Sequence, residues 1–168
     1  MEDESARLVA CIPRLRRYAR ALTGSRAEAD DLVQDTMERG WSKLSSWQRG
    51  SDMRAWLFGI MHNLHVDQTR KRRVTTEAFD EDMPQPATEP AQVDRLELRD
   101  LEAALRLLPV EQREILLLVA LEEMRYEDIA STLGIPVGTV MSRLSRGRER
   151  LRRLMEGRPV VSPLKVVK

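Results

Sequence analysis

Hydrophobic residues recur every three or four positions along most of this chain, which is the spacing of one face of an α-helix. The first such stretch covers residues 5–22. Its apolar positions are Leu8, Ile12, Leu15, Ala19 and Leu22. The pattern stops at the tripeptide Thr23-Gly24-Ser25, so the sequence predicts one amphipathic helix over residues 5–22.

Two further helices are predicted before the composition changes. Ser25 with Glu28 three residues on is a capping-box pattern, which predicts a helix that begins near residue 26 and ends near residue 44. Its predicted apolar face consists of Ala29, Leu32, Val33, Met37 and Trp41. The segment SSWQRGS (45–51) breaks the pattern and indicates a loop. A third amphipathic helix is expected from Asp52 to about Arg72.

Residues 75–95 differ from the rest of the chain. They hold Pro84, Pro86 and Pro90, and residues 77–94 contain six acidic side chains without a lysine or arginine. Such a composition has little apolar surface to bury and favours a flexible linker.

Helical periodicity returns at Leu96 and continues to Leu108. Pro109 favours the start of another helix, over about 110–123, which is apolar on more than one face and predicts the centre of a second bundle. Two more helices are expected at 126–133 and 137–155. The fold class is therefore all-α, with two small helical domains (1–74 and 96–156) joined by the acidic linker and followed by a tail at 157–168.

Composition supports this organisation. Aromatic residues make up 4% of the 168, which suits small helical bundles better than a sheet-rich fold. The longest apolar run, 115–121, is far shorter than the roughly 20 residues that cross a bilayer, and the N-terminus lacks the pattern of a signal peptide. The single cysteine, Cys11, excludes an internal disulfide and is expected to be a buried structural thiol.

The segment YEDIASTLGIPVGTVMSRLSRGRERL (126–151) has the features of a helix-turn-helix. Ala130 is small enough for a close helix crossing, Gly134 tolerates the positive φ of the turn, and Pro136 ends one helix and begins the next. The aliphatic residues expected in its core are Ile129, Leu133, Ile135, Val140 and Leu144.

Arginines follow this turn. Gly138 and Thr139 could meet a phosphate through backbone N–H groups, and Ser142, Arg143, Ser145 and Arg146 could reach the major groove. A plain helical hairpin with a solvated arginine face is the alternative. The coincidence of turn and charge favours DNA binding, but a helix-turn-helix alone does not indicate which class of DNA-binding protein this is.

Three segments, taken together, indicate which class of DNA-binding protein this chain resembles. They are EADDLVQDTMERGW (28–41), DMRAWLFGIMHNLHVDQTRKRR (52–73) and LPVEQREILLLVALEEMRYEDIASTLGIPVGTVMSRLSRGRERL (108–151). In this order they closely resemble bacterial RNA polymerase sigma factors of the extracytoplasmic-function (ECF) group, over residues 5–155. The resemblance implies a transcription initiation factor that binds core RNA polymerase, directs it to promoters and helps to melt the minus-ten element.

The resemblance also implies site residues. The helix that docks on the clamp of the polymerase largest subunit corresponds to Asp30, Asp31, Leu32, Val33, Gln34 and Asp35. Exposed carboxylates beside Leu and Val would give an apolar patch with a polar rim. Acidic residues near a helix N-terminus also stabilise the helix by themselves, and both roles are compatible.

For the minus-ten element, relatives use an aromatic loop residue and a helical asparagine to hold a flipped base, and a basic helix end to contact phosphates. The matching residues are Trp47, Asn63, Arg70, Lys71, Arg72 and Arg73. Stacking of a base on an aromatic ring contributes about 1–3 kcal/mol. The alternative for Trp47 is a loop aromatic packed on the domain core.

For the minus-thirty-five element, the resemblance implies contacts from the second helix of the helix-turn-helix. The residues are Val137, Gly138, Thr139, Met141, Ser142, Arg143, Ser145, Arg146 and Arg148. Met141 and Ser145 depart from the basic and larger residues common in relatives, so the resemblance implies use of a minus-thirty-five element but does not give its sequence. The implied partners are core polymerase (clamp and flap), promoter DNA and an anti-sigma factor, in the cytoplasm, without membrane insertion.

Two other classes of function remain alternatives. A free-standing helix-turn-helix regulator would leave the acidic and aromatic motifs of the first domain without a role. An enzyme or metal site would use His62, His65 and Asp67, but the sequence offers no third strong ligand, nucleophile arrangement or phosphate-binding glycine loop. We therefore expect no enzymatic activity, cofactor or metal.

Overall fold

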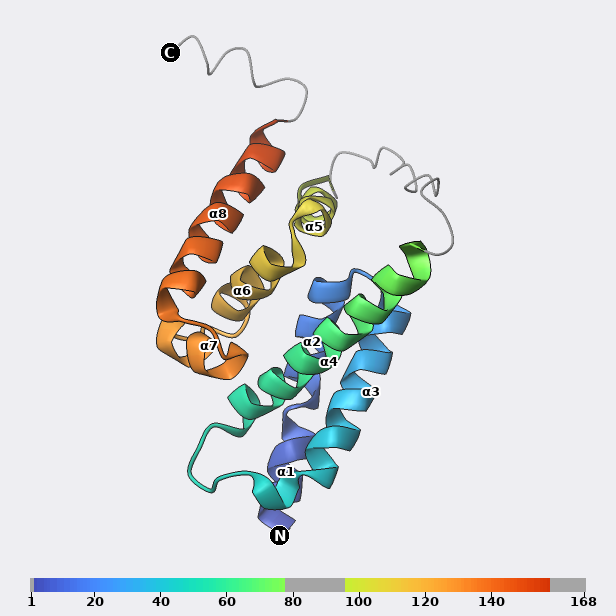
Figure 1. The fold of residues 1–168 in the computed structure, drawn as a ribbon, viewed down its shortest axis with the longest axis vertical. Helices are drawn as coiled ribbons and strands as arrows, with labels where there is room; N and C mark the ends of the chain where they lie inside the picture. Colours follow the sequence, from blue (N-terminus) through green and yellow to red (C-terminus); the bar gives the residue numbers. More distant parts are fainter. Residues whose placement is uncertain (1, 78–95, 158–168) are drawn as a thin grey trace.

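The computed structural model describes residues 2–77 and 96–157, which form helices without a strand in either range (Figure 1). The elements are α1 (Glu2–Ala10), α2 (Ile12–Thr23), α3 (Arg26–Ser42), a short 3-10 helix η1 (Leu44–Ser46), α4 (Met53–Glu77), α5 (Leu96–Leu107), α6 (Val110–Ala120), α7 (Tyr126–Leu133) and α8 (Val137–Glu156). The predicted all-α class is confirmed. The predicted linker, apart from 75–77, and the predicted tail, apart from Gly157, lie outside the described residues.

The single helix predicted over 5–22 is wrong, because α1 ends at Ala10 and α2 begins at Ile12. Pro13 stands in the first turn of α2, where its missing N–H costs nothing, whereas inside a continuous helix it would remove a hydrogen bond. The predicted apolar face survives the break, since Leu8, Leu15 and Leu22 are buried. Cys11 at the junction is half-buried, and its thiol donates to the Arg7 carbonyl at 3.3 Å.

Helix α3 begins as predicted. The Ser25 hydroxyl accepts from the Glu28 N–H at 3.4 Å. The Glu28 carboxylate instead binds the guanidinium of Arg72 at 2.7 Å, which ties the start of α3 to the end of α4. Helix α4 ends at Glu77, beyond the predicted end at Arg72 and three residues past the predicted domain boundary at 74.

Helix α6 is the centre of the second bundle, as its sequence predicted. Its residues 114–118 are all buried. Helix α8 crosses α6 at Gly147, where an added Cβ would lie 3.1 Å from Cδ1 of Leu116. A glycine at the crossing therefore lets the helix that carries the arginines approach the bundle centre closely.

The two bundles pack against each other. Helices α2 and α4 of the first bundle face α6 and α7 of the second (Figure 1). The buried apolar residues of both bundles form one hydrophobic cluster. At Gly59 of α4 an added Cβ would lie 3.2 Å from the carbonyl oxygen of Thr132 in α7. No helix within the described ranges is long and apolar enough to cross a membrane.

Candidate functional site

The turn between α7 and α8 has the geometry that its sequence predicts. Gly134 adopts a left-handed conformation (φ 69°), and its N–H and that of Ile135 both bond to the Ala130 carbonyl. Pro136 caps α8, and its carbonyl accepts from the N–H groups of Thr139 and Val140. Four of the five predicted core aliphatics are buried and Ile135 is half-buried. The helix-turn-helix is therefore confirmed as a packed unit.

The outward face of α8 carries most of the residues predicted to contact DNA. Val137, Met141, Ser142, Ser145, Arg146 and Arg148 are exposed. Gly138 is also exposed, with nothing within 4 Å of an added Cβ. The N–H of Thr139 is already bonded to Pro136, so the predicted phosphate contact through that group has a competitor within the protein.

The arginines of α8 fall into two groups. Arg152 binds Glu149 at 2.7 Å and Glu156 at 3.1 Å, and Arg153 binds Glu149 at 3.2 Å. The pKa of Glu149 is accordingly lowered, first by the Arg152 hydrogen bond. Arg146, Arg148 and Arg150 are exposed and make no ion pair within the described part of the chain. Positive charge available to a polyanion therefore precedes Arg152 along α8.

Arg143 is placed differently from its neighbours on α8. Its half-buried side chain lines a cavity of about 210 Å³, together with His65 and Arg70 of α4 and Glu114 of α6. The predicted minus-ten helix and the predicted minus-thirty-five helix thus border the same cavity. Spacing along the sequence gave no indication of this proximity.

The predicted polymerase surface on α3 is only partly exposed. Asp30, Asp31, Gln34 and Asp35 are exposed, but Leu32 is 0% and Val33 5% exposed, so the predicted apolar patch from Leu32 and Val33 is wrong. They face the core because they follow Ala29 on the buried side of the helix. The apolar group on the exposed side is Trp41, which is 58% exposed and which the periodicity had placed in the core.

Asp31, Asp35, Glu38 and Trp41 follow one another at helical spacings of three or four residues. They therefore share a face of α3. Trp41 is the last of these four, near the end of the helix. Its exposure could not be read from the sequence because a position at the boundary between two helical faces fits either pattern.

Trp47 is not free to stack on a base in this arrangement. The side chain is 6% exposed and belongs to the hydrophobic cluster, and its Nε1 has no hydrogen-bond partner among the described residues. The expectation of an open aromatic face is corrected accordingly. The ring fixes the segment after η1 to the core because a bulky apolar side chain gains more from burial than from exposure.

On α4 the exposed residues Asn63, Asp67 and Arg70 follow one another by three or four positions and form a strip. Asn63 and Arg70 are predicted minus-ten residues, whereas Asp67 would repel phosphate. Lys71 and Arg72 are exposed, and Arg72 is paired with Glu28. Arg73 lies within the helix, but its side chain lies outside the described residues.

The two histidines of α4 belong to the seam between the bundles. His62 contacts the carboxylate of Glu114 on α6 through Nδ1. Burial lowers the pKa of His65, although Glu114 opposes that shift. The described ranges contain no group of three residues that could hold a metal ion.

The seam also contains a fully buried carboxylate. The Glu122 side chain is 0% exposed, and three guanidiniums of the first bundle approach it: Arg14 at 3.8 Å, Arg17 at 3.6 Å and Arg54 at 3.6 Å. All three distances are too long for a hydrogen bond, so neither carboxylate oxygen of Glu122 has a hydrogen-bond partner among the described residues. Burial raises the pKa of Glu122, and the three guanidiniums only partly offset that effect.

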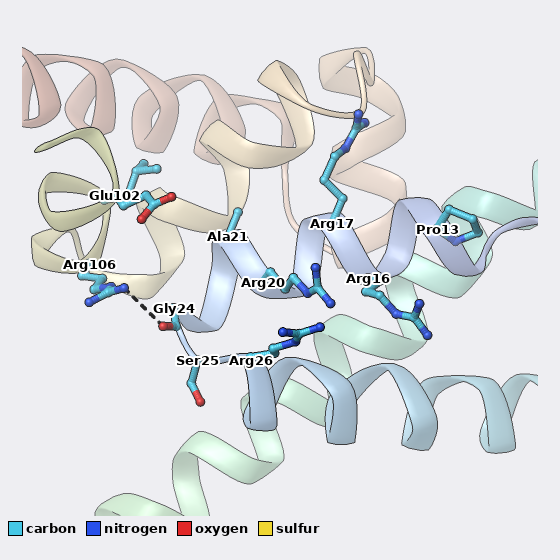
Figure 2. A pocket seen from close by; sticks show the side chains of 11 residues that line it. Pro13, Arg16, Arg17, Arg20, Ala21, Gly24, Ser25, Arg26, Glu102 and Arg106 are labelled. Atoms are coloured by element: carbon cyan, nitrogen blue, oxygen red, sulfur yellow. Dashed lines mark hydrogen bonds between the residues drawn. The ribbon is translucent and has the colours of Figure 1, made fainter. Parts of the chain in front are cut away.

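An arginine-lined cleft of about 680 Å³ lies at the same seam, between α2, the start of α3 and α5 (Figure 2). Arg16, Arg20 and Arg26 come from the first bundle, and Arg106 of α5 donates to the Gly24 carbonyl at 3.3 Å. Figure 2 shows Arg17 pointing away from Arg16 and Arg20, and its Nη2 donates to the Leu121 carbonyl at 2.9 Å.

Comparison with known families matches both bundles. Residues 8–62 match the model described as the Sigma2 domain of PhyR, and residues 98–151 match sigma-70, region 4. The first match covers α2, α3 and the beginning of α4, and the second covers the helix-turn-helix. The order of the two matches is the order predicted from the sequence motifs.

Relatives that align with most of this chain are sigma factors too. The chain is 41% identical over 149 residues to the ECF RNA polymerase sigma factor EcfG of Rhodopseudomonas palustris, an alignment that covers 88% of this chain and 82% of that protein. It is 34% identical over 141 residues to SigM of Mycobacterium tuberculosis, covering 84% of this chain and 71% of that one.

A solved structure of similar extent exists. The sigma factor RpoE of Bartonella quintana, in complex with the anti-sigma factor NepR, is 37% identical and superposes with a TM-score of 0.80 over 95% of this chain and 100% of that one. This family is not one of enzymes, and its members are initiation factors rather than free-standing regulators. With both sigma domains in order and these relatives matched over most of their length, the chain belongs to the ECF RNA polymerase sigma factors.

Proposed function

We propose that this sigma factor uses three separate surfaces: α3 for core polymerase, the exposed strip of α4 for the minus-ten element, and α8 from Val137 to Arg148 for the minus-thirty-five element. The observation that carries the proposal is the separation of charge between domains. The exposed face of α3 is acidic, whereas α8 presents Arg146, Arg148 and Arg150 without ion pairs among the described residues.

The polymerase surface consists of Asp30, Asp31, Gln34 and Asp35, with Trp41 as its apolar anchor. Burial of an aromatic side chain among polar neighbours is typical of the residues that dominate protein–protein affinity. Leu32 and Val33 contribute indirectly, because their burial fixes which side of α3 faces outward. The partner is the clamp of the polymerase largest subunit.

The minus-ten surface consists of Asn63 and the basic residues at the end of α4, with Asn63 reading a base and Arg70 and Lys71 contacting phosphates. Trp47 acts here by fixing the loop that precedes α4. The minus-thirty-five surface runs along α8 from Val137 to Arg148. Met141, 52% exposed at its middle, provides an apolar contact where a charged side chain would bind phosphate.

The remaining partners follow from the relatives. Because RpoE of Bartonella quintana was solved in complex with NepR, an anti-sigma factor is the proposed regulator of this chain too. The protein would act in the cytoplasm, where polymerase and promoter DNA are found. The acidic linker would pass along the polymerase channels for nucleic acid. No step of this function requires a cofactor.

The direct test is in vitro transcription with core RNA polymerase and a pool of promoter fragments from the source genome. Specific transcripts that depend on this protein are expected, and their start sites would give the promoter motif. Duplex binding without transcripts, and without co-elution with core polymerase, would contradict the proposal.

A further inference from the structure

The arginine-lined cleft shown in Figure 2 has no part in the proposed function, because none of the residues proposed to contact polymerase or promoter DNA lines it. Helix α2 and the start of α3 form one side of the cleft, and α5 forms the other. Its volume of about 680 Å³ is that of a pocket for a small molecule. The cleft is therefore large enough for a ligand that the proposed function leaves unassigned.

Three guanidiniums of the first bundle, called the cleft arginines below, line this cleft: those of Arg16, Arg20 and Arg26. Arg16 and Arg20 are four residues apart and therefore share a face of α2, and Figure 2 shows Arg26 of α3 pointing toward Arg20. All three are exposed, and none makes an ion pair within the described ranges. Like charges that gather without a counterion repel one another, so a bound anion would relieve the repulsion.

The carbonyl groups at the end of α2, which would otherwise attract the cleft arginines, already have donors. Arg106 of α5 donates to the Gly24 carbonyl at 3.3 Å, and Arg113 of α6 donates to the Leu22 carbonyl at 2.7 Å. Helix α3 begins at Arg26, so the positive end of its dipole adds to the field of the guanidiniums. The cleft arginines thus keep their donors available for a ligand in a positive field.

The side of the cleft toward α5 has a different chemistry. Ala21 and Leu105 line it with apolar surface, and Glu102 is the one acidic residue among the described residues that line the cleft. Figure 2 shows Glu102 on α5, apart from the cleft arginines. An ionised carboxylate repels phosphate but accepts hydrogen bonds from hydroxyl and amino groups. The lining therefore fits a ligand with a polyanionic end and a second end that is partly apolar and carries hydrogen-bond donors.

We propose that this cleft binds a nucleoside di- or triphosphate. The cleft arginines hold the phosphates, because a guanidinium donates two parallel hydrogen bonds to phosphate oxygens. The nucleoside lies toward α5 against Ala21 and Leu105, where Glu102 accepts from the ribose hydroxyls. The inference goes beyond the proposed function and does not depend on which surfaces contact polymerase or DNA. A ligand that binds only the folded chain also raises its melting temperature, which provides a second readout.

The experiment titrates ATP, GTP and inorganic tripolyphosphate into the free full-length protein by calorimetry at physiological ionic strength. One-to-one binding of a nucleotide is expected, and Arg20→Gln and Arg26→Gln should each weaken it about tenfold by removing charge-assisted hydrogen bonds. The matched control is Arg39→Gln, which removes the same charge from an exposed arginine of α3 outside the cleft and should leave the affinity unchanged. No saturable binding at millimolar nucleotide, or an equal loss in the control, would overturn the proposal.

Glu102→Ala distinguishes a nucleotide from inorganic polyphosphate. Loss of a repelling carboxylate should strengthen tripolyphosphate binding, whereas a nucleotide also loses its ribose acceptor and should bind more weakly. Equal strengthening of both ligands would overturn the assignment of the nucleoside. These variants change exposed side chains, so they should unfold like the parent without ligand. Saturating nucleotide should raise the melting temperature of the parent more than that of Arg20→Gln, and an equal rise in both would place the nucleotide outside the cleft.

Discussion

The amide of Gln68 on α4 donates to Oδ2 of Asp35 on α3 at 3.2 Å. This bond joins the proposed polymerase-binding helix to the proposed minus-ten helix. Both residues are near the surface, so the bond itself contributes little to stability. Its interest is that Asp35 has one partner inside the protein and, on the proposed function, another in the polymerase.

Replacement of Asp31 and Asp35 by Lys is expected to weaken core polymerase binding at least tenfold, because it reverses two charges on the docking face, while binding of the protein to duplex DNA stays intact. Affinity is measured by a polymerase pull-down titration. The control is Gln68→Ala, which removes the bond to Asp35 but leaves its charge. An unchanged polymerase affinity in the double variant would remove this face of α3 from the interface.

The two tryptophans Trp41 and Trp47 are expected to have opposite roles. Trp47→Ala removes a buried ring and should lower the free energy of unfolding by about 3–5 kcal/mol. Trp41→Ala removes an exposed ring, so unfolding should change by less than about 0.5 kcal/mol while polymerase affinity falls. Denaturant unfolding and the pull-down titration together test both expectations. A large loss of stability with Trp41→Ala would show that the Trp41 ring is packed in the core instead.

Arg146→Ala is expected to weaken binding to minus-thirty-five duplex DNA and to reduce the slope of log affinity against log salt by about one, because an unpaired guanidinium that contacts a phosphate is lost. Arg152→Ala is the matched control on the same helix. Arg152 is already paired with Glu149 and Glu156, so its loss should change the slope much less. Equal slopes for both variants would show that ion pairing on α8 does not select the contacts.

Gly134→Ala is expected to destabilise the second bundle by about 1 kcal/mol. Nothing lies within 4 Å of an added Cβ at Gly134, so the cost comes from its left-handed backbone (φ 69°) alone. Gly138→Ala is the comparison, because it lies in regular helix with equal space and should be neutral or stabilising. Thermal unfolding of the two variants measures the difference. Equal melting temperatures would contradict the conformational explanation.

The sequence predicted the helices and the turn because those features depend on local chemistry. Apolar spacing gave α6 to α8 within a few residues, and Ser25, Gly134 and Pro136 acted at the helix ends where they were expected. The break between α1 and α2 was missed because the apolar spacing continues across it, although Pro13 favours the start of a new helix there.

The misplaced site residues have a different origin. The apolar spacing of α3 placed Leu32 and Val33 on its buried face correctly, and the exposed patch was implied by the resemblance instead. For Trp41 and Trp47, burial depends on which element packs against them, and a helical pattern alone leaves that open. The contact between the two bundles could not be predicted from the sequence for the same reason. Arg113 and Gly59 are ordinary helical residues and Glu122 lies in the turn after α6, and only tertiary structure brings them to the other bundle.

The pH dependence of stability follows in part from Glu122. Burial raises the pKa of its carboxyl in the folded chain above the ordinary value that it has in the unfolded chain. Above the raised pKa both states are ionised, and the folded state bears the full cost of the buried charge. As the pH falls from the raised pKa to the ordinary pKa, the folded state binds more protons than the unfolded state, so the contribution of Glu122 to stability becomes more favourable across that window.

The charged groups facing Glu122 are Arg14, Arg17 and Arg54. A guanidinium is not deprotonated in proteins, so they do not reverse the sign. Glu122→Gln keeps the shape without the charge and should show a weaker pH dependence of stability. The melting temperature of the parent is expected to rise relative to that of Glu122→Gln as the pH falls across this window. A difference that stays constant with pH would contradict the role of Glu122.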